Sequence, residues 1–239
     1  MRPPPAAGVR VVTFSGFPPS APRLYEALAA DNSKESWRAR HRAVYERDVR
    51  APMEELAGEL SAHFAEYAGG VRLLGPVRDT RMSHDKSPYK TYQGGYLDVL
   101  PALGFWLHLD REGLYASGRW YPYGGAEVAR YRAAVGEEAD GAELAAITAR
   151  LTGLGFTIGG DRLATRPRGV PADHPRLELL RHRRIDAGRR LGPGPALGSA
   201  AAGAFVRETW ETVRPLLDWA AVRGLTPRPR GDRGADTPS

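Results

Sequence analysis

The sequence has 239 residues and no cysteine, which excludes disulfide bonds, thiol catalysis and cysteine-ligated zinc or iron–sulfur sites. It carries 34 basic and 28 acidic side chains, a formal net charge of +6, and 42% of its residues are hydrophobic, a composition typical of globular proteins. No apolar run approaches the roughly 18 residues of a membrane span, and the N-terminus lacks a signal-peptide pattern, so we expect a cytoplasmic protein with no membrane partner.

The sequence indicates one globular domain, which we expect to span residues 11–222. Residues 1–10 are rich in proline and are predicted to form a disordered N-terminal arm. Residues 223–239 combine prolines with charged side chains and are predicted to form a flexible C-terminal tail. A chain of this length can bury roughly 70–75% of its unfolded surface, which is enough for one large core.

The N-terminal third of the domain predicts helices. Ser20 is expected to cap a short helix, and Asn32 or Ser33 to cap a longer one. Pro52 is expected to kink or restart this second helix, because proline lacks a backbone donor and its ring clashes with the preceding turn. An apolar stripe then continues at helical spacing to Tyr67.

The rest of the domain alternates between extended and helical patterns. In chain order these patterns predict an extended segment at 71–83, a hairpin formed by 105–110 and 114–120, helices at about 124–135 and 140–152, a second hairpin at 156–165, a short helix at 175–184 and a closing helix from Ser199. Helices at both ends with hairpins between them favour a single α+β domain, with helices packed on a mainly antiparallel sheet.

Residues 78–90 concentrate polar side chains. These thirteen residues hold four fixed cations, two carboxylates, a histidine and a tyrosine. Pro88 directs the residue before it away from helix, so we expect residues 85–89 to form a turn, and turns on a rigid scaffold often carry functional groups. The chain has only three lysines against 31 arginines, and two of the three, Lys86 and Lys90, fall here. This bias indicates a site that needs a compact ammonium group.

The segment predicts a pocket for a small anionic ligand that bears a phosphate or a carboxylate. The candidate ligand-binding residues are Arg78, Asp79, Arg81, Lys86 and Lys90, joined from neighbouring elements by Arg119 and Arg168. The carboxylate of Asp79 is expected to orient a neighbouring arginine and leave its other donors for the ligand. The candidates for proton transfer, and so for catalysis, are His84, Asp85 and Tyr89. The pattern does not decide between an enzyme and a binding protein.

Two other interpretations of the charges are open. The cations and carboxylates at 78–90 can form an ion-paired turn in a scaffold protein with no small ligand. Residues 162–190 carry nine arginines against three carboxylates, an excess equal to the net charge, and this excess predicts a nucleic-acid-binding surface as the second choice. No aromatic residue lies in that stretch, which argues against stacking on single-stranded bases.

The sequence carries no motif for a metal or a cofactor. Its six histidines are scattered, with neither an HExxH motif nor a facial triad, so no metal site is predicted. It has neither a Walker A loop nor a Rossmann fingerprint, and no cofactor is predicted. The oligomeric state is not indicated by any pattern.

Several motifs resemble those of one family. The segment Phe14–Pro18, Asn32 with Trp37, and Tyr45 before Pro52 are similar to the opening of the family catalogued as domain of unknown function 2461, found in bacteria and some fungi. The later motifs that match it are 78–81, 85–90, 117–122, 166–169 and 173–175. The resemblance covers roughly residues 14–222, although Met82 stands where an aromatic is usual. It implies a shared architecture and no particular reaction.

Overall fold

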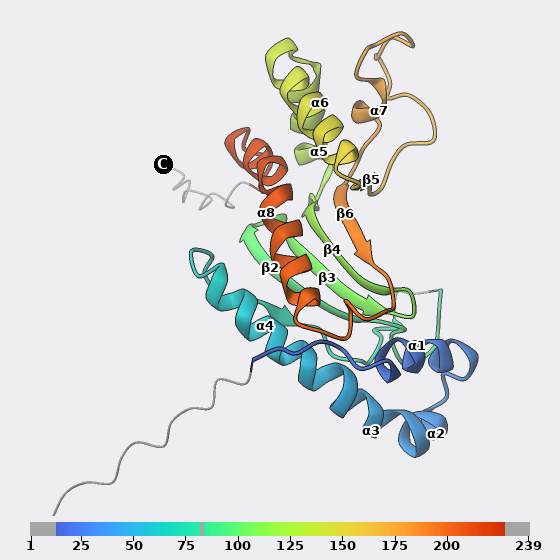
Figure 1. The fold of residues 1–239 in the computed structure, drawn as a ribbon. Coiled ribbons are helices and arrows are strands. Elements are labelled where there is room, and N and C mark those ends of the chain that lie inside the picture. The colour runs from blue at the N-terminus through green and yellow to red at the C-terminus, as the bar shows by residue number, and fades with distance from the viewer. Residues whose placement is uncertain (1–12, 82–83, 228–239) are drawn as a thin grey trace, which may run out of the picture.

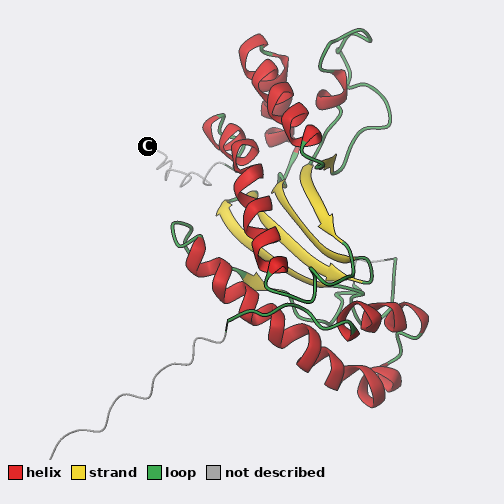
Figure 2. Ribbon diagram, viewed as in Figure 1, coloured by secondary structure: helices red, strands yellow, loops and turns green. Residues whose placement is uncertain are grey.

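The computed structural model describes residues 13–81 and 84–227 (Figure 1). The arm predicted at residues 1–10 lies outside this range, as do all but the first five residues of the tail predicted at 223–239. In the described chain, helices pack on an antiparallel sheet (Figure 2). This architecture confirms the predicted α+β fold.

In the described residues six strands form one sheet, in the order β1-β2-β3-β4-β6-β5, and every neighbouring pair is antiparallel. The strands are β1 Arg72–Leu73, β2 Gln93–Leu100, β3 Leu103–Asp110, β4 Gly113–Trp120, β5 Thr157–Gly159 and β6 Ile185–Leu191. The first predicted hairpin is confirmed as β3 and β4. The strands β2 and β6 were not predicted.

Helices precede the first strand of the described chain, lie between β4 and β6, and follow the last strand. They are α1 Ser20–Ala30, α2 Lys34–Ser36, α3 Arg42–Val44, α4 Ala51–His63, α5 Gly125–Gly136, α6 Glu138–Gly153, α7 Leu177–Leu180 and α8 Ala201–Val222, with two π-helical segments, η1 Trp37–His41 and η2 Tyr45–Arg50. The helices predicted near 124–135 and 140–152 are confirmed as α5 and α6. The helix predicted at 175–184 is shorter, because only α7 is helical there.

The core lies between the sheet and the helices on one of its faces. Helix α8 crosses β3, β4 and β6 on that face (Figure 1), and its fully buried Trp210 stacks on Phe105 of β3 with 5.1 Å between ring centroids. Phe64, at the end of α4, contacts both rings. A Cβ at Gly118 of β4 would lie 2.7 Å from Val213 of α8, so the missing side chain lets helix and sheet approach closely.

One continuous helical run extends from α2 to α4 through the two π segments. Ser33 caps its N-terminus, as predicted, because its hydroxyl accepts a hydrogen bond from the Ser36 amide at 3.1 Å. Pro52 lies in the first turn of α4, directly after η2. A widened π turn moves the preceding carbonyl away from the proline ring, so the run passes through this position.

Two local predictions are wrong. The Ser20 hydroxyl does not cap α1 but donates to Asp48 at 2.7 Å, since the helix already begins at Ser20 with Pro19 before it. Residues 156–165 do not form a hairpin, because β5 pairs with β6 instead. Gly160 follows β5 with a φ of +105° and turns the chain out of the strand, and Arg162 then bridges to His182.

Candidate functional site

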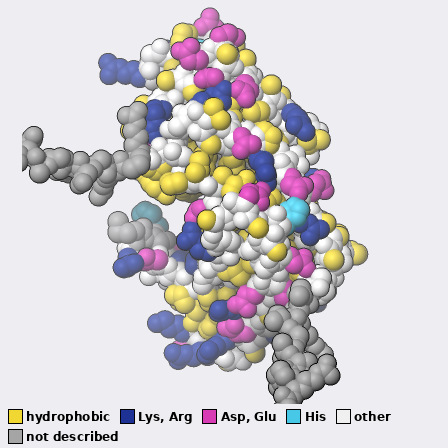
Figure 3. Space-filling model, turned by 90° about the vertical axis from the view of Figure 1, so that its left-hand side faces the viewer, with side chains coloured by type: hydrophobic (Ala, Val, Ile, Leu, Met, Phe, Trp, Pro, Cys, Tyr) yellow, Lys and Arg dark blue, Asp and Glu magenta, His cyan; other side chains and the backbone are white. Residues whose placement is uncertain are grey.

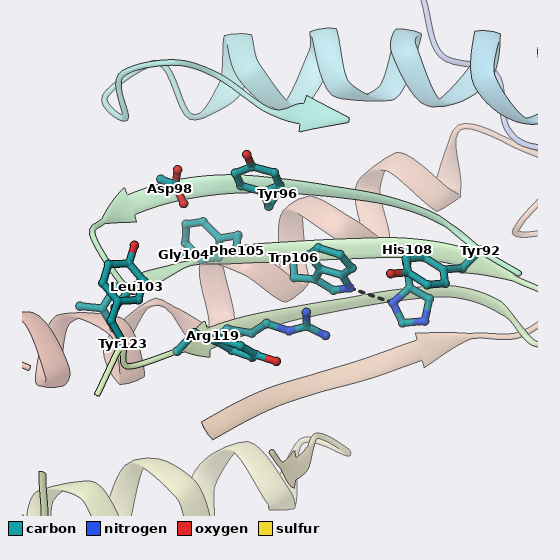
Figure 4. Close-up of a pocket in the computed structure, with 12 residues that line it drawn as sticks. Tyr92, Tyr96, Asp98, Leu103, Gly104, Phe105, Trp106, His108, Arg119 and Tyr123 are labelled. Carbon is teal, nitrogen blue, oxygen red and sulfur yellow. Dashed lines mark hydrogen bonds between the residues drawn. The ribbon is translucent and has the colours of Figure 1, made fainter. Parts of the chain in front are cut away.

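The sheet has a face that α8 does not cover. Along β3, Phe105 points to the helices, whereas Trp106 and His108 project from the opposite face and are half-buried. By the same alternation Tyr96 of β2 and Arg119 of β4 lie on this second face, with Tyr96 directly opposite Trp106 in the register. We call it the open face; in Figure 4 helix α8 passes behind the strands that carry these side chains.

A cavity of about 590 Å³ lies on the open face (Figure 4). It is lined by Tyr92, Tyr96, Asp98, Ala102, Leu103, Gly104, Phe105, Trp106, His108, Arg119, Tyr121 and Tyr123. Half of these residues are aromatic, and we call the cavity the aromatic chamber. Its volume falls in the range of roughly 300–1,000 Å³ that is usual for small-molecule sites.

A second cavity, of about 450 Å³, adjoins the first and shares three lining residues with it, His108, Arg119 and Tyr121. The other residues that line it are Tyr115, Gly159, Gly160, Asp161, Arg184, Ile185, Asp186 and Arg190. Its lining includes three arginines and two aspartates, and we call it the polar chamber. The two chambers therefore lie side by side on the open face, over β2, β3, β4 and β6.

Side chains on the open face form a closed ring of contacts. Its first half runs along β3: the Trp106 indole donates to His108 Nδ1 at 2.9 Å, and His108 Nε2 lies 3.1 Å from Asp110. Arg190 of β6 then binds both oxygens of Asp110, at 2.6 and 3.1 Å. Two-point arginine–carboxylate contacts of this kind are strong and orient both partners.

The second half of the ring returns through β4. The Arg190 guanidinium lies 5.6 Å from the Tyr115 ring, and the Tyr115 hydroxyl donates to Asp186 at 2.5 Å. Asp186 also pairs with Arg119 Nε, and the Arg119 guanidinium lies 4.3 Å from the ring of Trp106, where the first half began. We call these seven residues the open-face ring.

The ring fixes the protonation pattern of His108. An indole can only donate a hydrogen bond, so His108 Nδ1 must accept it and carries no proton. Nε2 then carries the proton and donates it to Asp110. Both imidazole nitrogens are engaged, so His108 orients Trp106 and has no nitrogen left to act as a base.

The open-face ring also shifts the pKa values of Tyr115 and Asp110. Burial, followed by the charge of Asp186, raises the pKa of the Tyr115 phenol, which therefore stays a donor. Burial alone would raise the pKa of Asp110, but hydrogen bonds from His108, Arg190 and the Glu112 amide outweigh it and lower the pKa to about 2. Asp110 is accordingly ionised in the native state down to strongly acidic pH.

This depressed pKa predicts an acid-sensitive contribution to stability. As pH falls from the ordinary value of 3.8 towards about 2, the unfolded chain protonates Asp110 before the native state does, so the free energy of unfolding drops. With solvent screening included, we expect a loss of about 1–2 kcal/mol over this interval. Denaturant unfolding at several pH values should show that the free energy of unfolding changes less with pH in Asp110→Asn than in wild type. The same pH dependence in both proteins would show that Asp110 does not contribute to acid sensitivity.

The segment that carries the predicted site folds back as a short two-stranded ribbon, whose described residues are 76–81 and 84–90. Val77 and Tyr89 form an antiparallel bridge, the Arg78 amide donates to the Pro88 carbonyl at 2.9 Å, and the Lys90 amide donates to the Pro76 carbonyl at 2.8 Å. Of the extended segment predicted at 71–83, only β1 belongs to the sheet, and residues 82–83 lie outside the described range.

The four predicted cations of the ribbon all have partners within it or beside it. Lys86 Nζ donates to the Thr80 carbonyl at 2.8 Å, Lys90 Nζ to the Gly75 and Val77 carbonyls at 2.6 and 3.0 Å, Arg78 pairs with Asp85 at 3.1 Å, and Arg81 pairs with Asp79 at 2.7 Å. Burial, and then the charge of Arg78, lower the pKa of Lys90. These are the contacts of an ion-paired turn; a role in ligand binding stays a prediction.

The three proton-transfer candidates lie on the same ribbon. Asp85 accepts hydrogen bonds from the Ser87 hydroxyl and amide, and these bonds lower its pKa. Tyr89 stacks on Trp37 of η1, with 4.2 Å between centroids, and Asn32 holds its backbone through two hydrogen bonds. His84 is exposed at the tip of the ribbon. The catalytic role of these residues stays a prediction.

Of the two predicted residues from neighbouring elements, one lies in the hollow and the other does not. Arg119 lines both chambers and belongs to the open-face ring. Arg168 is exposed in the segment between β5 and α7 and lines neither chamber. The structure therefore brings Arg119 together with Trp106 and His108, which the sequence did not connect with it.

Most arginines of the 162–190 segment have partners in the described chain. Arg176 donates to the Val135 and Gly136 carbonyls, Arg181 to the Leu163 and Ala164 carbonyls, and Arg183, Arg189 and Arg190 pair with Asp161, Glu208 and Asp110. Figure 3 shows the side of the molecule turned away from α7 and the loop before it, and there basic side chains lie among acidic ones. A nucleic-acid surface here stays a prediction.

Two general features complete the description. Within residues 13–81 and 84–227, no group of three or more histidine and acidic side chains is placed to hold a metal ion. No helix in that part of the chain combines the length and the apolar character needed to cross a membrane.

Sequence reasoning missed most of the open face. It did not single out Trp106 or His108, nor Tyr92, Tyr96, Tyr121 or Tyr123. A usable signal was present, because β3 alternates buried aliphatic residues with Trp106, His108 and Asp110, an unusual set for a solvent-facing strand. The pairing of β3 with β4 follows from the predicted hairpin, but the pairing of β4 with β6, which completes the site, was not visible in the chain order.

The described fold is that of an α+β protein with one antiparallel sheet, covered by helices on one face and hollowed on the other. The chain belongs to the family described as conserved hypothetical protein (DUF2461), whose model matches residues 21–219. This match confirms the resemblance seen in the motifs. Neither the curated proteins nor the solved structures contain a match to the chain.

Proposed function

We propose that the protein binds a small anionic ligand, one that bears a phosphate or a carboxylate, on the open face of the sheet. The observation that carries this proposal is a pair of guanidinium groups, those of Arg119 and Arg184, each stacked on an aromatic ring beside the residues that line both chambers. Guanidinium groups held in this way are suited to an anion, because they are oriented before the ligand arrives.

Arg119 is held by its inner part and presents its outer part to the hollow. Its guanidinium lies on Trp106 and its Nε pairs with Asp186. Within the described residues no hydrogen bond uses its two terminal nitrogens. Those two donors form the planar fork that suits a two-point contact with a phosphate or a carboxylate.

Arg184 adds a charge that the described chain does not balance locally. Its guanidinium lies 4.2 Å from the Tyr121 ring, and it donates to the Tyr121 hydroxyl at 3.0 Å. No carboxylate of the described residues lies within ion-pair distance of Arg184, whereas Arg183 beside it pairs with Asp161. A guanidinium without a carboxylate partner, at the wall of a cavity, favours the binding of an anion.

The geometry supports binding and assigns no reaction. His108 has both nitrogens engaged, and the Tyr115 phenol is committed to Asp186. The proton-transfer candidates His84, Asp85 and Tyr89 belong to the 76–90 ribbon rather than to the lining of either chamber. We therefore propose a binding role at the open face.

The test is a thermal-shift titration of the full chain with inorganic phosphate, phosphate esters, carboxylates and short RNA and DNA. A ligand that binds only the native state raises the unfolding midpoint in proportion to its affinity. We expect a small anion to stabilise the wild type. Arg119→Met should weaken its binding by about 10- to 150-fold, the equivalent of a charged hydrogen bond of about 1.5–3 kcal/mol.

Two matched variants locate the site. Arg166→Gln removes an exposed arginine that lines neither chamber and should bind like wild type. The double variant Lys86→Met/Lys90→Met tests the ribbon: a loss of binding there, with Arg119→Met unaffected, would place the ligand on the ribbon and overturn the open-face proposal. Salt-sensitive binding of DNA or RNA with no small anion bound would overturn it in favour of a nucleic-acid surface.

A further inference from the structure

The two chambers differ in chemistry, although one ligand could occupy both. The aromatic chamber presents the rings of four tyrosines and of Trp106, and its charged lining residues are one arginine and one aspartate. The polar chamber presents three arginines against two aspartates. His108, Arg119 and Tyr121 line both, so the two chambers adjoin at these three residues. A molecule with an apolar end and an anionic end matches this arrangement.

We propose, resting on the function proposed above, that the ligand is an aromatic ring that carries a phosphate or a carboxylate. The ring lies in the aromatic chamber among the tyrosines and Trp106. The anionic group lies at the junction of the chambers, which Arg119 lines and where Arg184 stacks on Tyr121, a residue that the chambers share. The two ends of the ligand are thus recognised by different physical means.

The orientation of Trp106 supports the ring half of the proposal. A Cβ at Gly94 of β2 would lie 2.9 Å from Trp106 Cη2, so the missing side chain makes room for the indole to lie over the neighbouring strand. The hydrogen bond to His108 and the stack with Arg119 hold the indole in that orientation. Such a flat platform favours planar rings, which gain from stacking beyond the area they bury.

The tyrosines at the rim support the same conclusion. Tyr123 is 74% exposed and Tyr121 is 47% exposed, and both line the aromatic chamber. Large rings left this open on a folded surface are typical of ligand or partner sites. Figure 4 shows Tyr96 on the strand next to Trp106 and Tyr123 at the left-hand end of the chamber near Leu103.

The anionic half of the proposal depends on the two arginine stacks. Arg119 on Trp106 and Arg184 on Tyr121 each join a cation to a ring, and Trp106 lines the aromatic chamber while Arg184 lines the polar one. A ring that enters among the aromatic side chains therefore brings its substituent to two guanidinium groups. Hydroxyl-rich ligands would use neither the stacking faces nor the charges fully.

The experiment compares pairs of ligands that differ only in the π face. Phenyl phosphate is compared with cyclohexyl phosphate, and benzoate with cyclohexanecarboxylate, by calorimetric titration of the full chain; inorganic phosphate and glucose 6-phosphate complete the set. In at least one pair we expect the aromatic member to bind about 3- to 10-fold tighter than its saturated partner. The pair that shows this difference distinguishes a phosphate ester from a carboxylate.

Two variants connect the preference to the chamber. Trp106→Leu should remove the preference for the aromatic member, and Tyr123→Leu, at a highly exposed position that folding does not require, should reduce it. Inorganic phosphate should bind Tyr123→Leu and wild type equally. Val222→Leu, on the other side of the sheet from the chambers, serves as a control and should leave all affinities unchanged.

The outcomes separate this inference from the function on which it rests. Equal binding of aromatic and saturated members, with Arg119→Met still weakening both, would overturn the inference and leave the proposed function standing. Tighter binding of glucose 6-phosphate than of phenyl phosphate would overturn it in favour of a sugar ligand. If none of these anions bound, both proposals would fail.

Discussion

Replacement of Trp210 by alanine is expected to lower the free energy of unfolding by about 3–5 kcal/mol. The side chain is fully buried and stacks on Phe105, and its ring centroid lies 5.5 Å from that of Phe64. Its indole N–H donates to the Trp106 carbonyl at 3.2 Å. Truncation removes the packing between α8 and the centre of the sheet and leaves a cavity there. In a domain of this size the loss corresponds to a fall in the unfolding midpoint of roughly 6–20 °C.

The matched control lies on the same helix. Val222 is 82% exposed, so Val222→Ala should change the free energy of unfolding by less than about 0.5 kcal/mol. Chemical denaturation of both variants, followed by far-UV circular dichroism, makes the comparison. A loss of under 1 kcal/mol for Trp210→Ala would mean that α8 does not pack on β3 as described.

Replacement of Gly160 by alanine is the second large effect, expected to cost about 2–6 kcal/mol from backbone strain and overpacking together. Gly160 has a φ of +105°, which L-residues rarely adopt. A Cβ there would also lie 2.3 Å from the Arg184 carbonyl oxygen and 3.1 Å from the Ile185 Cα, which are backbone atoms that cannot rotate away. Because Gly160 lines the polar chamber, the same change should displace Arg184.

The neighbouring glycine provides the control for this effect. A Cβ at Gly159 would meet only the Asp186 carbonyl oxygen, at 3.6 Å, and its φ lies outside the left-handed region. Gly159→Ala should therefore be neutral or stabilise the protein by about 0.4–1 kcal/mol through the unfolded state. Thermal unfolding of the two variants side by side tests the turn, and equal midpoints would contradict it.

The elements that the sequence predicted well are those whose pattern is local. Helices α5 and α6 and the β3–β4 hairpin follow from periodicity and from turn residues next to them in the chain. Strands β2 and β6 were not predicted, because glycines and charged residues interrupt their apolar pattern. The glycines in these two strands are explained by side chains on neighbouring strands, since Gly94 makes room for Trp106 and Gly188 makes room for Tyr115. Such partners are distant in sequence.

In the candidate site, too, the features formed by residues close in sequence were predicted and those formed by distant residues were not. The cluster at 78–90 was visible because its charges are contiguous, and the structure shows that these charges pair largely with one another. Arg119 was named, but its partners Trp106 and Asp186 come from two other strands. A site assembled across strands depends on register, which no single segment of the sequence encodes.

The open-face ring bears on how that register is specified. A slip of β6 by one residue would turn its apolar side chains away from α8, so the core excludes it. A slip by two residues keeps every side chain on its own face, and apolar burial alone discriminates against it weakly. The same slip would part Asp186 from Arg119 and Arg190 from Asp110, leaving charges without partners. Polar contacts on the uncovered side thus distinguish alignments that the hydrophobic side would tolerate.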